Sequence, residues 1–236
     1  MYPTTFKSLF VALFLLVVSQ QAYSTCSFYQ KLVDNNDGTI TDPRTGLIWQ
    51  KCAFGQMWNE KNCEGEAHSV IFELAMFAAK FERYAEKEDW RIPSTSEMES
   101  LTAPQGTCED EMERQASIDK KFPTTEVRST SGNRLYWTST RHIFNEEPAA
   151  SAFKNLKFYY LVNIVDRTKL PTPLGWHLLR FVRAGNGTLP VDFENEYAEN
   201  FKSKETENLC LMGSLGFIPK SRWQEVRPML EKNCLE

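Results

Sequence analysis

Short apolar runs separated by turn residues mark the region from Asp34 to Cys52, and the rest of the chain reads as a cover for it. The sequence DNNDGTITDPRTGLIWQKC places the β-branched run 39–41 before a Pro/Gly turn and the apolar run 47–49 after it. Asn, Asp and Gly tolerate the backbone angles of tight turns, and Pro fixes φ in the second turn. The pattern predicts a compact β-hairpin with one side against a core.

Between residues 67 and 87 the apolar period lengthens to that of a helix. The apolar positions that fall on one stripe are Val70, Leu74, Phe77, Ala78 and Phe81. The charged residues assigned to the opposite side are Lys80, Glu82, Arg83, Glu86 and Lys87. This pattern predicts an amphipathic helix whose stripe faces the core, with a partner-binding face as the alternative.

A third patterned segment, DWRIPSTSE at residues 89–97, predicts a strand that ends at Pro93, because proline cannot continue a hydrogen-bonded ladder. The run 94–97 then supplies an N-cap and a first-turn carboxylate for a second helix over residues 96–101. Trp90 is a core candidate, and Arg91 is expected to form a salt bridge with Asp89 or Glu97.

Residues 103–134 read as a long loop, and strand patterns return at 135–140, within 152–166 and at 178–182. After Arg183 the composition shifts, and residues 185–187 read as a linker. The positions that repeat at helical spacing beyond it are Phe193, Tyr197 and Phe201, followed by Trp223, Val226 and Leu230 in a last helix. Ser221 is a candidate cap for that last helix and Pro228 a weak point within it. We therefore expect one domain over residues 25–184 and a helical C-terminal extension over 185–236.

The first 24 residues have the pattern of a secretory signal peptide. Lys7 precedes an apolar run of ten at residues 9–18, and Ala22-Tyr23-Ser24 places small residues at the positions that signal peptidase requires. Ten apolar residues are too few to span a bilayer core about 30 Å thick. Cleavage before Thr25 is the expectation. A retained anchor is the alternative, and Cys26 follows a poor approach sequence for a lipid anchor.

Composition excludes few functional classes, but the cysteine content indicates the compartment of the protein. The chain has 236 residues, 42% of them hydrophobic, and a net charge of −4, which argues against a general nucleic-acid binder and leaves a local basic patch open. Removing the signal segment takes away Lys7 and leaves all six cysteines. An even number of cysteines in an exported chain predicts disulfides. A zinc site is the alternative, but the chain has no CxxC pair and its three histidines are scattered.

Six cysteines permit 15 pairings. Cys52 and Cys63 bracket a loop of ten residues and are the easiest to pair. The pairs Cys26–Cys108 and Cys210–Cys234 are suggested by position alone. The motif DNNDG is similar to the start of a calcium loop, but Gly38 follows Asp34 by four residues and no glutamate stands at the twelfth position. We therefore expect neither a metal nor a cofactor.

Five ordered motifs over residues 28–184 resemble the Lcl C-terminal domain family, which is named for a bacterial collagen-like adhesin. They are DGTITDPRTGLIWQKC with the cysteine that follows at 63, DWRIPSTSEM, FP at 122, YWTST, and FVRAG. The resemblance implies an exported α+β domain of C-type-lectin-like architecture, with a mixed or antiparallel sheet, two flanking helices and long loops. It implies that the first and last strands pair, that the turns use Gly38 and Gly46, and that tryptophans at 49, 90 and 137 fill the core. It also implies that Arg183 pairs with a buried carboxylate.

The chain departs from the adhesin in two ways. It has no Gly-X-Y period, and the extension after Ala184 has no counterpart in the family pattern. YWTST also stands where calcium-dependent lectins carry a Trp-Asn-Asp type motif, so calcium-dependent sugar binding is not expected.

The leading functional hypothesis is a non-catalytic extracytoplasmic binding module for a glycan, a glycosaminoglycan or an envelope ligand. The candidate contact residues, whose alternatives are solvated arginines and core aromatics, are Arg128, Arg134, Arg141, Tyr159, Tyr160 and Trp176. An accessory role in an envelope assembly such as a pilus or secretion system is the second hypothesis, because the extension offers aromatic residues to a partner. An enzyme is the third: a reactive cysteine pair or a Ser/His/Asp set would be needed, and no GxSxG elbow is present.

Overall fold

The computed structural model describes residues 26–123, 134–144, 156–186, 204–218 and 222–234. The predicted signal segment, the candidate Arg128, the repeat at residues 193–201 and the candidate cap Ser221 lie outside these ranges. Within them, no helix combines the length and the apolar character needed to cross a bilayer.

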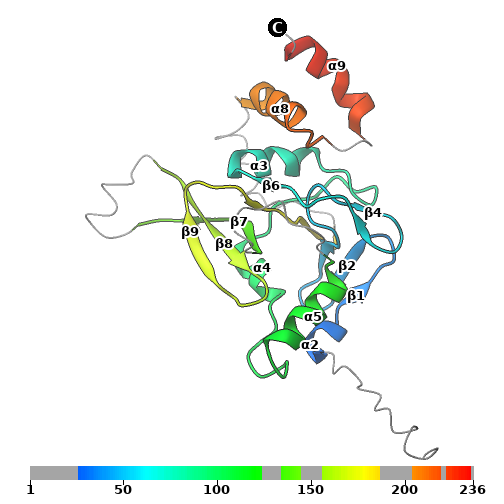
Figure 1. Ribbon diagram of the computed structural model, residues 1–236, viewed down its shortest axis with the longest axis vertical. Coiled ribbons are helices and arrows are strands. Elements are labelled where there is room, and N and C mark those ends of the chain that lie inside the picture. Colours follow the sequence, from blue (N-terminus) through cyan, green and yellow to red (C-terminus); the bar gives the residue numbers. More distant parts are fainter. Residues whose placement is uncertain (1–25, 124–133, 145–155, 187–203, 219–221, 235–236) are drawn as a thin grey trace, which may run out of the picture.

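The α+β class is confirmed, but the strands form two main sheets rather than one (Figure 1). The first sheet has the order β1-β2-β3-β11, with all strands antiparallel: β1 (Val33–Asp34), β2 (Thr39–Asp42), β3 (Leu47–Gln50) and β11 (Val182–Ala184). The second has the order β6-β10-β7-β8-β9: β6 (Ser69–Val70), β10 (His177–Leu178), β7 (Leu135–His142), β8 (Phe158–Asn163) and β9 (Lys169–Thr172). It is mixed, because β10 runs parallel to β7.

The closing strand joins the sheet of the opening hairpin, but it does not pair with the first strand as the family resemblance implies: β11 pairs with β3, and β1 lies at the opposite edge of the sheet. Trp49 on β3 lies opposite Val182 on β11, so the closing strand joins the hairpin at its third strand. Gly38 and Gly46 have φ of +87° and +70°, which confirms the turn positions. Arg183 on β11 donates to Asp89 at 2.7 Å, and the Asp89 side chain is only 17% exposed.

The predicted strand at 178–182 is instead two strands in different sheets. Between them lies Arg180, which is fully buried and donates to the carbonyls of Gln50 (2.8 Å) and Lys51 (2.5 Å). A guanidinium has several N–H donors, so Arg180 can hydrogen-bond both backbone carbonyls where the chain passes from one sheet to the other. Arg180 therefore ties the closing segment to the end of β3.

Helices cover the second sheet on both faces. On one side Phe72, the first residue of α3 (Phe72–Phe81), stacks on Tyr159 of β8. On the other side α4 (Thr95–Ser100) packs through Thr95, whose hydroxyl hydrogen-bonds Thr138 of β7 at 3.0 Å. The predicted N-cap and first-turn carboxylate are Ser94 and Glu97, and the two residues form a reciprocal capping box.

The first helix is shorter than its apolar period predicts. Val70 pairs with His177 in β6, and the chain leaves the helix at Glu82, where ψ is 132°. Two residues with positive φ, Ala85 and Glu86, then turn the chain sharply. Tertiary pairing at one end and turn geometry at the other therefore override the local helical pattern.

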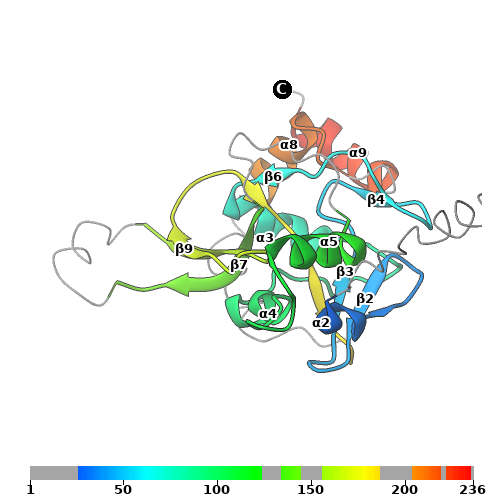
Figure 2. The ribbon, with the colours of Figure 1, turned by 60° about the horizontal axis from the view of Figure 1, so that its bottom comes forward.

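The prediction of a loop over residues 103–134 is wrong in its centre, where α5 (Glu111–Lys121) forms. Asp110 caps this helix by accepting from the backbone N–H of Glu113, and acidic first-turn and basic last-turn residues favour the helix dipole. Its apolar face is short, since Ile118 is its only buried aliphatic residue. Figure 2 shows α5 beside the short helix α2 (Ser27–Gln30).

The core consists of two apolar clusters that hold the three predicted tryptophans, each at most 1% exposed. The expected salt bridge of Arg91 is formed with Glu97, through two bonds of 2.5 and 2.6 Å. The predicted strand around Arg91 is reduced to one bridge with Val182. All six cysteines are paired as suggested, in Cys26–Cys108, Cys52–Cys63 and Cys210–Cys234.

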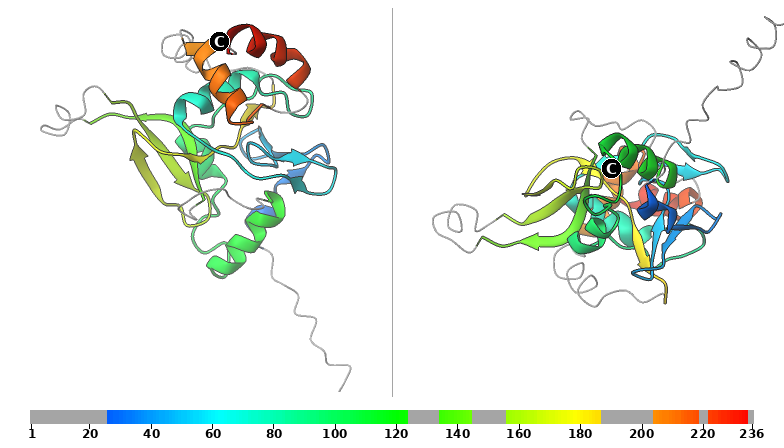
Figure 3. Two further views of the ribbon diagram at one scale, coloured as in Figure 1. Left: turned by 45° about the horizontal axis from the view of Figure 1, so that its top comes forward. Right: turned by 90° about the horizontal axis from the view of Figure 1, so that it is seen from below.

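The C-terminal extension packs on its own domain. Its helices α8 (Glu205–Ser214) and α9 (Trp223–Asn233) lie over α3 (Figures 1 and 3). Leu209, Met212, Val226 and Leu230 join the same apolar cluster as α3, and Lys80 pairs with Glu205. The aromatic residues at 193–201 that first suggested a docking tail are not among the described residues.

Candidate functional site

The residues predicted as ligand contacts do not converge on one site. Arg134 precedes β7 and pairs with Asp119, whereas Arg141 is exposed near the other end of the strand, roughly 20 Å away at the usual rise per residue. Trp176 is 49% exposed in the segment before β10.

The two tyrosines of β8 point to opposite faces. Tyr159 is only 3% exposed, and its ring stacks on Phe72 at 3.5 Å, so it belongs to the core and is not available to a ligand. Tyr160 is half-buried, and its hydroxyl hydrogen-bonds Nδ1 of His142 at 2.7 Å. Alternation along the strand gives the two neighbours these different environments.

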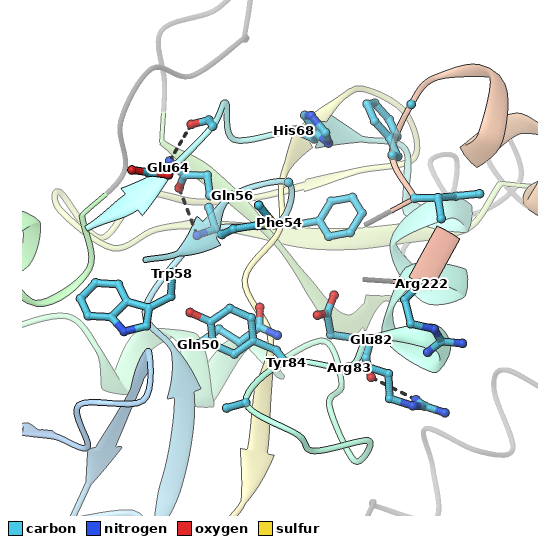
Figure 4. Close-up of a pocket in the computed structure, with 18 of the residues that line it drawn as sticks. Gln50, Phe54, Gln56, Trp58, Glu64, His68, Glu82, Arg83, Tyr84 and Arg222 are labelled. Carbon is cyan, nitrogen blue, oxygen red and sulfur yellow. Dashed lines mark hydrogen bonds between the residues drawn. The ribbon is translucent and has the colours of Figure 1, made fainter. Parts of the chain in front are cut away.

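A cavity of about 570 Å³ lies instead between the end of β3, the end of α3 and the C-terminal extension (Figure 4). Its size is that of a site for a small organic ligand. The residues that line it are Asp37, Gln50, 53–58, 64–65, His68, 82–85, 216–218 and Arg222.

One wall of the cavity is held in place by the disulfide between Cys52 and Cys63. This bond closes the loop that carries residues 53–58 and the small hairpin of β4 (Met57–Trp58) with β5 (Cys63–Glu64). Gly55 allows the loop to pass close to His68, because a Cβ there would lie 2.5 Å from the ring. The wall is therefore rigid and its backbone approaches its neighbours closely.

Trp58 and Tyr84 pack against the hairpin turn at Gly38. The Tyr84 hydroxyl donates to the carbonyl of Gly38 at 3.0 Å, and Lys51 lies 4.1 Å from the centre of the Trp58 ring. Burial raises the pKa of Tyr84, so its hydroxyl stays protonated as a donor. The indole nitrogen of Trp58 is buried and has no hydrogen-bond partner among the described residues.

Glu82 is the most unusual residue of the cavity. It follows the last residue of α3 in extended conformation and is only 9% exposed. Burial raises the pKa of its carboxyl to about 7, although the Gln50 side chain, the backbone N–H of Arg83 and the charges of Arg222 and Arg83 oppose this shift.

The cations near Glu82 are committed to other partners. Arg83 pairs with Glu88 at 2.9 Å and donates from Nη1 to the carbonyl of Glu82. Arg222 donates to the carbonyl of Phe81 at 2.8 Å and to Glu225 at 2.7 Å. No described residue forms an ion pair with the Glu82 carboxyl, so its charge has no direct counterion.

The amide of Gln50 lies beside this carboxyl (Figure 4). Gln50 is 2% exposed, and its amide nitrogen meets no hydrogen-bond acceptor at bonding geometry in the described ranges, although its dipole favours the ionised form of Glu82. Buried polar atoms are normally satisfied. The pair therefore places a buried amide beside a buried carboxyl that no described cation neutralises through an ion pair.

The C-terminal extension supplies the last wall. The Phe217 ring stacks on His68, with ring centres 4.4 Å apart, and meets Phe54 edge-on at 6.3 Å. The disulfide between Cys210 and Cys234 links α8 to α9 on either side of this segment. The cavity is thus completed by residues more than 130 positions from its first wall.

The sequence pattern predicts Glu82 on the solvent side of the helix, whereas the structure buries it. Glu82 follows Ala78 by four residues and Leu74 by eight, which places it at the edge of the apolar stripe. The burial of Glu82 could have been inferred from this spacing. The roles of Gln50, Phe217 and Arg222 left no local signal, since each becomes part of the cavity only through tertiary packing.

In chemical terms the cavity combines flat aromatic faces with buried donors and acceptors. Every cysteine is in a disulfide, so this state has no thiol nucleophile. Within the described ranges, no group of three or more His, Cys, Asp or Glu is arranged to hold a metal ion. Recognition of a polar organic molecule is the chemistry that these groups support.

The comparisons agree with the sequence motifs. A family model described as Lcl C-terminal domain matches residues 38–183, which is more than half of the chain. No curated protein and no solved structure matches it. The matched range contains Gln50, Trp58 and Glu82 but ends before Phe217 and Arg222.

Proposed function

Because the chain belongs to the Lcl C-terminal domain family, we propose that it is an exported, non-catalytic binding module that holds a saccharide in the cavity between β3, α3 and the extension. The family is named for a collagen-like adhesin, which supports a role in surface binding. Three disulfides are typical of proteins of the periplasm or the cell exterior and support export to one of them.

The observation that carries the proposal is the lining of the cavity. Saccharides present flat C–H faces and a dense set of hydroxyl groups, so their sites need aromatic rings together with fixed donors and acceptors. Trp58 and Tyr84 supply rings, while Gln50 and Glu82 supply buried polar groups, and no described residue forms an ion pair with Glu82.

A sulfated glycosaminoglycan is a poorer candidate than the original hypothesis held. Arg134 is paired with Asp119, and Arg141 lies at the far end of the same strand, so the two form no joint anion site. The cavity itself carries the carboxyl groups of Asp37, Glu64 and Glu82. Both arginines of the lining are ion-paired with Glu88 and Glu225, and the exposed carboxyls of Asp37 and Glu64 would repel a sulfate, which disfavours binding.

A glycan array probed with the oxidised chain from residue 25 onward tests the proposal, followed by titration with the best ligand. We expect Trp58→Ala to weaken binding at least tenfold, because it removes a ring of the cavity wall. Trp176→Ala is the matched control, since Trp176 is exposed elsewhere and was itself a predicted contact. Absence of binding to every glycan, or loss of binding in the control alone, would refute the cavity as the saccharide site.

The accessory role in an envelope assembly remains the second candidate. Leu211 on α8, Leu215 just after it, and Trp223 and Met229 on α9 are exposed, and residues of both helices line a hollow of about 390 Å³. A photo-crosslinker placed at Leu215 in cells that produce the protein tests this idea, with the exposed Glu207 as the control position. Crosslinks to one defined envelope protein from Leu215 only would favour it over the saccharide proposal.

A further inference from the structure

The charged groups of the cavity restrict the class of saccharide that it can bind, an inference that rests on the proposed function. The titratable and charged groups that line it come from five places in the chain. They are Asp37 from the β1–β2 turn, Glu64 from β5, His68 just before β6, the run 82–84 after α3, and Arg222 from the extension. Both arginines are held in ion pairs with glutamates outside the lining, at Glu88 and Glu225. The free charge that remains in the cavity is therefore acidic.

The two outer carboxyls are already hydrogen-bonded. Asp37 accepts from the backbone N–H of Thr39 at 2.9 Å, and Glu64 accepts from the amide of Asn59 at 2.5 Å. Both residues are exposed, so water also solvates them. Glu82 differs, because its carboxyl is buried beside the amide of Gln50 and no described cation forms an ion pair with it.

We propose that the cavity selects saccharides that carry a free primary amine, and that the ammonium group binds between the carboxylate of Glu82 and the side-chain oxygen of Gln50. An ammonium donates up to three hydrogen bonds in several directions. It would supply a counterion that no described residue provides to the buried carboxylate, and the nearby ring of Tyr84 offers an additional cation–π contact.

The proposal has a proton signature. Glu82 is desolvated and holds its proton near neutral pH, whereas a bound ammonium would favour the carboxylate. Binding at pH 6.5 should therefore release a proton, and the heat measured by titration calorimetry should change between two buffers with different ionisation enthalpies. A ligand that only stacks on the aromatic walls would give no such dependence.

The test compares two trisaccharides with one backbone: the β-1,4-linked trimer of glucosamine and its fully N-acetylated form. We expect the amine form to bind at least tenfold more tightly at pH 6.5. In Glu82→Gln this preference should fall below threefold. Glu73→Gln, which makes the same substitution at an exposed carboxyl in the first turn of α3, should keep the full preference.

The outcomes separate this inference from the proposed function. Equal binding of the two trimers, or a preference that survives Glu82→Gln, overturns the amine selectivity and leaves saccharide binding intact. Failure of both trimers and of all other glycans overturns both. Trilysine, a cation without a sugar, should bind at least tenfold more weakly than the glucosamine trimer. Equal and Glu82-dependent binding of trilysine would keep the ammonium site and refute the saccharide function.

Discussion

The buried carboxyl of Glu82 makes a quantitative prediction about stability and pH. In the unfolded chain this group has an ordinary pKa of 4.5, and burial raises the pKa in the folded protein to about 7. Below pH 4.5 both states hold the proton, so the group costs no stability. Between pH 4.5 and 7 only the unfolded state releases it, and the free energy of unfolding falls as the pH rises.

The size of the effect follows from the two pKa values. A difference of about 2.5 units, at 1.36 kcal/mol per unit, corresponds to about 3 kcal/mol above pH 7. Glu82→Gln has nearly the same shape and no proton to lose. We therefore expect the variant to match the parent protein near pH 4 and to be more stable by about 3 kcal/mol at pH 8.

Urea denaturation of the oxidised proteins, followed by tryptophan fluorescence from pH 4 to pH 9, measures this difference. Glu73→Gln is the control, because it removes an exposed carboxyl from the first turn of the same helix and should change stability by less than about 1 kcal/mol at any pH. If the curves of Glu82→Gln and Glu73→Gln run parallel over the whole range, the carboxyl of Glu82 is not desolvated and the reasoning fails.

Three further predictions concern the parts that hold the cavity. Gly38→Ala should destabilise the fold by about 1–3 kcal/mol in urea, because φ is +87° and a Cβ would lie 2.5 Å from the nearest side-chain oxygen; Gly46→Ala, with positive φ but open space, should cost less. Replacing Cys210 and Cys234 together by serine should cost about 3 kcal/mol on the loop-entropy model and speed hydrogen exchange in α8 and α9 before the rest of the chain. Glu97→Gln should lower the free energy of unfolding by roughly 2–3 kcal/mol at pH 7, because it removes the carboxylate that pairs with the buried Arg91. Burial opposes ionisation of Glu97, but the hydrogen bonds from Arg91 outweigh it and lower the pKa of Glu97. The cost should therefore vanish as the pH falls through this lowered pKa.

Elements whose signals lie within a few residues were predictable from sequence. The turns at Gly38 and Gly46 depend on local φ preferences, and the cap at Ser94 depends on a glutamate three residues later. The helix α5 has the same kind of local signal, in Asp110 and Glu113. It was not predicted because a helix that buries so little apolar surface has almost no hydrophobic period.

Elements that depend on pairing partners were not predictable. Leu178 and Val182 are four residues apart in one strand-like run, yet each pairs with a different sheet. The run itself has no information about this division, since both residues are apolar and buried in either arrangement. The crossing is fixed by Arg180, whose buried guanidinium finds its two carbonyls only once β3 is in place.

The cavity illustrates the same limit at the level of function. Gln50 is the last residue of a strand, Glu82 follows the last residue of a helix and Arg222 precedes the first residue of another, so all three stand at element termini. Only packing turns these termini toward one space, and only the loss of solvent there gives the carboxyl of Glu82 an unusual pKa. Gln50 and Glu82 lie within the range that the family model matches, whereas Phe217 and Arg222, which form the last wall of the cavity, lie beyond it. The proposed ligand would therefore meet groups from both the matched domain and the C-terminal extension.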